Sequence, residues 1–64
     1  MEENALLNLQ QGHTYLICRN HGSVYSANIL LITDKAYHIC WDSGNETWEL
    51  KGKLNDTYEL VEDI

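Results

Sequence analysis

The 64-residue chain contains no proline, no low-complexity linker and no long apolar run. Without these features, nothing in the chain marks a boundary between two domains. No stretch approaches the roughly 20 apolar residues of a membrane-spanning helix. The acidic start Met1-Glu2-Glu3 is also unlike an export signal. We therefore expect a single cytoplasmic domain over residues 1–64 that does not enter a membrane.

Cysteine is scarce, with only Cys18 and Cys40 in the chain. Two cysteines could form a disulfide, but without an export signal a reducing compartment is expected. Both are then most simply small, half-buried apolar side chains. The three histidines could join them in a zinc site, but the CxxC or HxxxH spacing of structural zinc sites is missing. We expect no metal and no cofactor.

Catalytic constellations are also missing. His38 and Cys40 fall on one face of an expected strand, about 7 Å apart along it, which is too far for a direct hydrogen bond. Paired carboxylates, as in glycosidases, need a cleft between elements, and a domain this small offers little of one. We expect a protein that is not an enzyme.

What the sequence does contain is a strand-rich centre, residues 26–50. Residues 29–33 are rich in β-branched side chains, and residues 37–41 alternate as in a half-buried strand. Asp42-Ser43-Gly44-Asn45 carries the residues of a hairpin loop. This loop is expected to bring Trp41 and Trp48 to the same face of neighbouring strands.

The remaining elements follow from local patterns. Strands are expected at 14–19, at 24–33 with a bend near Asn28 or Leu30, and at 58–61. Turns are expected at 20–23, 34–35 and 55–56, and a short helical turn at 51–54. Residues 2–11 could form a two-turn helix capped by Asn4 and ended by Gly12, or an irregular lead-in.

These elements predict an all-β fold, a small five-stranded SH3-like barrel over residues 13–64 with a lead-in over residues 1–12. A small antiparallel sheet must curl to enclose a core and protect its edges. An OB-like barrel is the alternative, although it normally needs a longer chain. The expected core consists of Tyr15, Ile17, Ala27, Ile29, Ile32, Tyr37, Ile39, Trp41, Trp48, Leu50, Leu54 and Leu60.

A recurrent pattern supports this fold. Residues 32–37 read I-T-D-K-A-Y, residues 11–15 read Q-G-H-T-Y, and the later positions of the pattern are Trp41, Gly44, Trp48 and Lys51. Over roughly residues 11–61 the chain resembles small SH3-like (Tudor- or KOW-like) proteins of bacteria and their phages. It has Leu50 and Gly52 where that pattern has proline and serine. The resemblance implies a phage or mobile-element protein in the cytoplasm of a bacterial host.

The charge is strongly uneven along the chain. The chain has ten acidic and four basic residues, for a formal charge of −6. Residues 42–64 contain seven of the acidic residues and two lysines. Such a surface repels phosphate backbones, so we expect no direct nucleic-acid binding. Its simplest role is solubility. The functional alternative is a face for a basic partner protein, in its sharpest form a mimic of DNA.

We therefore expect a non-catalytic protein-interaction module that binds and modulates a host protein, as an inhibitor for example. The expected acidic binding residues are Glu46, Glu49, Glu59, Glu62 and Asp63. Trp41, Trp48 and Tyr37 are most simply core residues. The alternative is an aromatic cage for a methylated cation, as in Tudor-like barrels, which Tyr25 and Tyr58 could join with Asp42 nearby. The alternative is a nucleic-acid-associated SH3-like domain using Arg19, Lys35, Lys51 and Lys53. The sequence leaves open a monomer or a small homo-oligomer.

Overall fold

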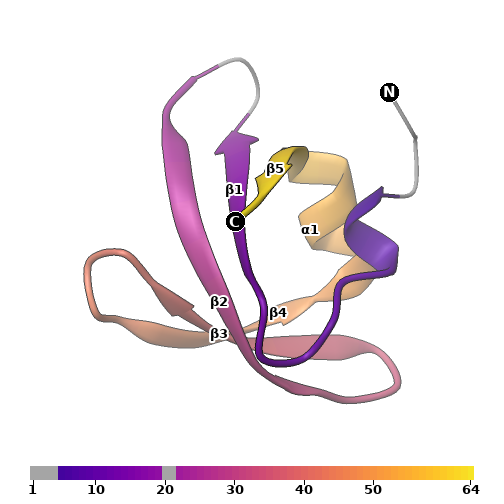
Figure 1. Cartoon of the computed structure of the whole chain (residues 1–64). Helices are drawn as coiled ribbons and strands as arrows, with labels where there is room; N and C mark the ends of the chain where they lie inside the picture. Colours follow the sequence, from indigo (N-terminus) through magenta and orange to yellow (C-terminus); the bar gives the residue numbers. More distant parts are fainter. Residues whose placement is uncertain (1–4, 20–21) are drawn as a thin grey trace.

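The computed structural model describes residues 5–19 and 22–64, which form one antiparallel sheet of five strands with one short helix (Figure 1). The strand order is β4-β3-β2-β1-β5, so β4 and β5 are the two edges. The predicted mostly-β composition and the number of strands are confirmed. The elements are η1 (Ala5–Leu7), β1 (Thr14–Arg19), β2 (Val24–Ile32), β3 (Ala36–Trp41), β4 (Glu46–Leu50), α1 (Lys51–Thr57) and β5 (Tyr58–Asp63).

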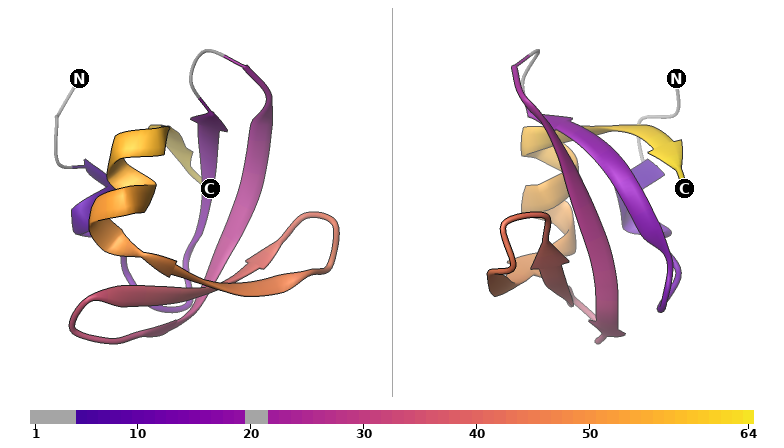
Figure 2. Two further views of the ribbon diagram at one scale, coloured as in Figure 1. Left: turned by 180° about the vertical axis from the view of Figure 1, so that it is seen from behind. Right: turned by 60° about the vertical axis from the view of Figure 1, so that its left-hand side comes forward.

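The sheet is strongly bent, and the β3–β4 hairpin runs across the direction of β1 and β2 (Figure 2). A shift in the β2–β3 register lies between Ile29 and Leu31, within the region where the sequence predicted a bend. The extra residue, Leu30, bends the strand and increases its twist. A second register shift lies between Leu16 and Ile17 in the β1–β5 pairing.

The lead-in is irregular apart from the single 3₁₀ turn η1. The expected Asn4 cap lies outside the described residues. Gly12 ends the segment with a φ of 85°, in the left-handed region that glycine adopts readily. Leu6 and Leu9 are buried although the expected core omits them. Leu6 lies beside α1, where its N–H donates to Asn55 Oδ1 at 3.2 Å.

The other helix is longer than predicted. The expected turn at 51–54 continues as α1 to Thr57, so the turn expected at Asn55-Asp56 is wrong. The helix buries Leu54 against the sheet and η1, and this packing stabilises the helical conformation of an otherwise polar segment. Of the turn expected at 20–23, Asn20 and His21 lie outside the described residues. At the end of β1, the Arg19 N–H donates to Ser23 O at 3.0 Å.

The core lies on the concave face of the sheet, which we call the inner face. Most of the expected core is confirmed as buried or packed against the buried residues. Trp48 and Leu50 are the exceptions, with 55% and 59% of their surface exposed. The buried residues are Leu6, Leu9, Tyr15, Ile17, Ala27, Ile29, Tyr37, Ile39 and Leu54, and Tyr25, Ile32, Trp41, Tyr58 and Leu60 pack against them.

The exposure of Trp48 follows from the length of the β3–β4 loop. Cys40 pairs with Glu46, and Gly44 adopts a φ of 91°, so the loop has three residues ending in a left-handed glycine. A four-residue loop would have placed Trp41 and Trp48 on one face. One residue fewer turns every β4 side chain to the other face. Trp48 therefore stacks on His38 on the outer face, with ring centroids 4.6 Å apart.

This position makes Trp48→Ala a mild substitution. We expect it to lower the free energy of unfolding by at most about 1 kcal/mol, because it removes an exposed stacking contact and leaves no cavity. Denaturant unfolding of dilute protein measures this loss. A loss of 3 kcal/mol or more, typical of a buried tryptophan, would contradict the outward position.

Candidate binding site

Three aromatic side chains meet on the inner face, at the end of the sheet where β1 and β3 finish. They are Tyr25 of β2, Trp41 of β3 and Tyr58 of β5, each partly buried. The ring centroid of Tyr25 lies 6.1 Å from that of Trp41 and 6.2 Å from that of Tyr58, and both pairs are edge-to-face. Trp41 and Tyr58 complete the triangle at 5.8 Å. We call these three rings the aromatic cluster.

A chain of hydrogen bonds holds the indole of Trp41 in place. Its Nε1–H donates to Thr47 Oγ1 at 2.7 Å, and the Thr47 hydroxyl donates to Glu49 Oε2 at 2.8 Å. The loop that follows Trp41 is tied to β2, because the Asp42 N–H donates to Ser26 O at 3.0 Å. The ring and the carboxylates near it are therefore anchored by β2 and β4.

The aromatic cluster forms one wall of a cavity of about 270 Å³ that opens to solvent. The rest of the lining is polar and comes from the β3–β4 hairpin, namely Asp42, Ser43, Asn45 and Thr47. Aromatic faces and a nearby carboxylate both attract positive charge. The cavity therefore suits the ammonium or guanidinium group of a lysine or arginine side chain. We call it the aromatic pocket.

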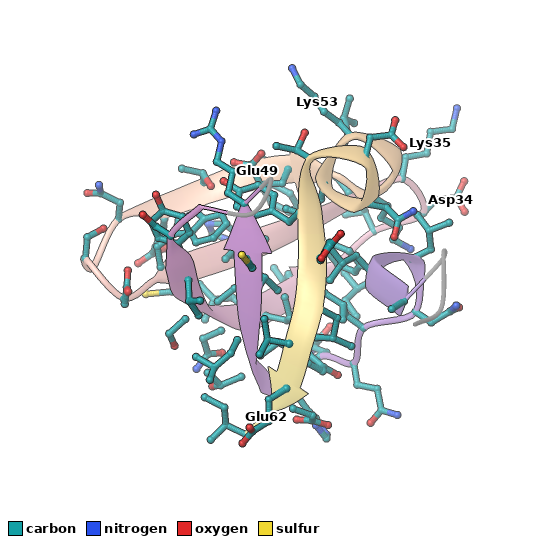
Figure 3. All side chains as sticks on the ribbon, turned by 90° about the horizontal axis from the view of Figure 1, so that it is seen from above. Asp34, Lys35, Glu49, Lys53 and Glu62 are labelled. Atoms are coloured by element: carbon teal, nitrogen blue, oxygen red, sulfur yellow. The ribbon has the colours of Figure 1, made fainter. Side chains whose placement is uncertain are left out.

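The expected acidic residues lie on both edge strands instead of one surface. Glu46 and Glu49 belong to β4 and face opposite sides, whereas Glu59, Glu62 and Asp63 belong to β5. Glu49 and Glu62 point to opposite sides of the molecule in Figure 3. Only Glu49, through Thr47, is connected to the aromatic pocket.

Two of these acids have histidine neighbours. Glu46 Oε1 lies 3.5 Å from His38 Nε2 on the outer face. Asp63 Oδ2 lies 3.5 Å from His13 Nδ1, beside the start of β1. Glu59 and Glu62 are placed opposite Cys18 and Leu16 in the β1–β5 register. The structure thus brings Tyr25 and Tyr58 together and separates the acids.

Three of the four cations gather at a second place. Lys35, Lys51 and Lys53 line a shallow cleft of about 410 Å³ together with Asp34, Leu50 and Gly52. Lys35 and Lys53 project on the same side of the molecule in Figure 3. The Lys51 ammonium lies 5.3 Å from the centre of the Tyr37 ring, which holds it against the core. We call this the lysine cleft.

The cysteine and histidine side chains that the structure describes form no shared centre. Cys18 and Cys40 are free thiols, both half-buried. Within residues 5–19 and 22–64, no group of three or more histidine, cysteine, aspartate or glutamate side chains is placed to hold a metal ion. In the same described part of the chain, no helix has the length and apolar character to span a membrane.

The sequence predicted Tyr25 and Tyr58 as possible site residues and left two interpretations open for Trp41, most simply the core or else an aromatic cage with these tyrosines. The feature that favours the cage is the position of Trp41 as the last strand residue before the polar loop at Asp42. A ring there has core on one side and solvent on the other.

Comparison with known proteins identifies no relative: no family model, no curated protein and no solved structure matches this chain.

Proposed function

We propose that this chain is a non-catalytic protein-interaction module that binds a basic segment of a partner protein. The aromatic pocket receives one lysine or arginine side chain of that segment. The observation that carries the proposal is the contact of Tyr25, Trp41 and Tyr58 around a cavity with Asp42 in its lining. Three rings that touch one another and border solvent offer a preformed site, so little ordering is needed on binding.

The energetics suit a weak, selective contact. A cation over an aromatic face contributes about 0.5–2 kcal/mol, more as the site loses water. The Asp42 carboxylate adds attraction at the loop, and the Thr47–Glu49 hydrogen bond keeps a second carboxylate near it. Affinity beyond the micromolar range then requires contacts outside the pocket.

The remaining acids act at longer range. With a formal charge of −6, the chain attracts a basic partner before contact and speeds their encounter. Glu46, Glu59, Glu62 and Asp63 contribute to this steering from the two edge strands. The partner in this proposal is a host protein of a bacterial cell, and the chain is an inhibitor encoded by a phage or mobile element. A partner that normally binds DNA fits such an acidic mimic.

The proposal includes an SH3-like barrel as the fold. Its support is the antiparallel order β4-β3-β2-β1-β5, with a short helix between the fourth and fifth strands, together with the sharp bend of the sheet. A pocket between the β3–β4 hairpin and neighbouring strands is a natural place for a ligand on such a scaffold, since rigid strands hold the loop.

The test is binding of a short lysine- and arginine-rich peptide, with a glutamate-rich peptide of equal length as the control. Removal of one ring by Tyr25→Ala or Tyr58→Ala should weaken binding about tenfold or more, while Trp48→Ala, outside the pocket, should not. Because Tyr25 and Tyr58 also pack on the core, circular dichroism must show that the variants are folded. Equal affinity for both peptides would contradict the proposal.

The lysine cleft favours a second candidate function, association with nucleic acid through Lys35, Lys51 and Lys53. Such binding should weaken steeply as salt rises, with a slope set by the phosphates neutralised. Titration of a fluorescent single strand at two salt concentrations decides between the candidates. The acidic module should show no binding at either.

A further inference from the structure

The outer edge of β4 presents unused backbone hydrogen-bonding groups. β4 ends the strand order, so β3 is its only paired neighbour among the described residues. The Trp41 N–H donates to Asn45 O at 2.8 Å, and the Lys51 N–H donates to Lys35 O at 2.9 Å. Because hydrogen-bonded pairs alternate along antiparallel strands, the odd-numbered residues of β4 bond to β3. The N–H and C=O groups of Glu46 and Trp48, and the N–H of Leu50, then point away from the sheet. The Leu50 C=O is already used, because Leu50 is the N-cap of α1 and its carbonyl accepts the first helical bond.

The same three residues place their side chains on the outer face, next to further apolar surface. Trp48 and Leu50 are more than half exposed. In the register, Trp48 lies opposite His38, and His38 lies opposite Leu31, which is 49% exposed. An exposed edge strand that also carries apolar side chains is a template for pairing with another strand. Natural edges usually avoid this combination.

We propose that two copies of this chain pair through β4, antiparallel and centred on Trp48, to form one continuous sheet across a two-fold axis. This dimer goes beyond the proposed function, since the three rings of the aromatic pocket belong to β2, β3 and β5. The register pairs Trp48 with the partner's Trp48 and Glu46 with the partner's Leu50. Both outward backbone groups of Trp48 can bond to the partner's Trp48, and the Leu50 N–H faces the C=O of the partner's Glu46. The outward-pointing groups of the two edges therefore lie in matching positions.

Charge complementarity favours a second copy over an unrelated strand. Leu50 forms part of the lysine cleft, whose other walls include Lys35 and Lys53. In the proposed register, Glu46 faces the partner's Leu50 and therefore lies at the mouth of the partner's lysine cleft. The two-fold axis repeats this contact, so each copy supplies one acid and one cluster of lysines. One edge strand buries little area, so the dimer should be weak and concentration-dependent.

The first test measures mass and amide exchange of the intact chain over about a hundredfold range of concentration. Sedimentation should show conversion from monomer to dimer. The amide hydrogens of Trp48 and Leu50 should become protected by about tenfold or more as the dimer forms. The Thr47 amide, which bonds to β3 in either state, should not change. A monomer at every concentration, or a dimer whose Trp48 amide stays unprotected, overturns the proposal.

The second test uses charge reversal at exposed positions, where folding is not at risk. Glu46→Lys alone, or Lys35→Glu with Lys53→Glu, should weaken dimerisation about tenfold. Combining all three substitutions should restore dimerisation, because a lysine at position 46 then faces glutamates at positions 35 and 53 and the two sides attract again. Glu62→Lys on β5 is the matched control and should have no effect beyond that of net charge. Failure of the combined variant to recover would overturn the contact between Glu46 and the lysine cleft.

Discussion

Replacement of Tyr37 by alanine is expected to unfold this protein. Tyr37 is fully buried, and its hydroxyl donates to Leu6 O at 2.8 Å while accepting the Leu9 N–H at 3.2 Å. Truncation of a buried aromatic ring costs about 3–5 kcal/mol. A domain of this length has a total stability on the order of 5 kcal/mol. Circular dichroism at room temperature should show loss of the β signal, and a variant that keeps its cooperative transition at near-normal stability contradicts the packing described.

Tyr37→Phe separates the hydroxyl from the ring. It leaves the Leu6 carbonyl and the Leu9 N–H without their partner, which should cost about 1–3 kcal/mol. Burial raises the pKa of Tyr37 above its ordinary value of 10.0, although the hydrogen bond from the Leu9 N–H opposes this shift. As the pH rises above about 10, the unfolded chain loses this proton first, so stability falls. The Phe variant should lose stability less steeply in that range.

Leu6→Ala is expected to cost about 2–5 kcal/mol, as much as a substitution within a strand. Leu6 has 1% of its surface exposed. Its C=O accepts the Tyr37 hydroxyl, and its N–H donates to Asn55 of helix α1. The lead-in therefore closes one side of the core. Leu31→Ala, a leucine on the outer face that is 49% exposed, is the matched control and should cost about 1 kcal/mol or less. Equal effects of the two substitutions would show that the lead-in is not part of the core.

Local patterns in the sequence were sufficient for most of the fold. The bounds of β1 at Thr14 and Arg19 were predicted correctly, because turn-forming residues flank a clean alternation. The side of the sheet to which the β4 side chains point was not predicted correctly, because Asp42-Ser43-Gly44-Asn45 is compatible with a three- or a four-residue loop. The loop length decides whether Trp48 lies on the inner or the outer face. The burial of Leu6 and Leu9 depends on contacts with residues far along the chain, which local periodicity does not contain.

The candidate site could be predicted only in part. Tyr25 and Tyr58 lie 33 positions apart, and the sequence alone suggested but could not establish that β2 and β5 bring them together. The acids appeared as one group because they are neighbours in sequence. The sheet order instead places β4 and β5 at opposite edges. The partner, the barrel and the phage origin remain predictions, since no comparison bears on them.

The most direct measurement of the central claim is a two-dimensional NMR titration that follows the two indole N–H signals. Trp41 Nε1 lies in the aromatic pocket, bonded to Thr47, whereas Trp48 lies on the outer face and serves as an internal control. Addition of the lysine- and arginine-rich peptide to dilute protein should shift the Trp41 signal in a saturable manner and leave the Trp48 signal in place. A Trp41 signal that does not move while Trp48 or the β5 amides shift would contradict the assignment of the pocket.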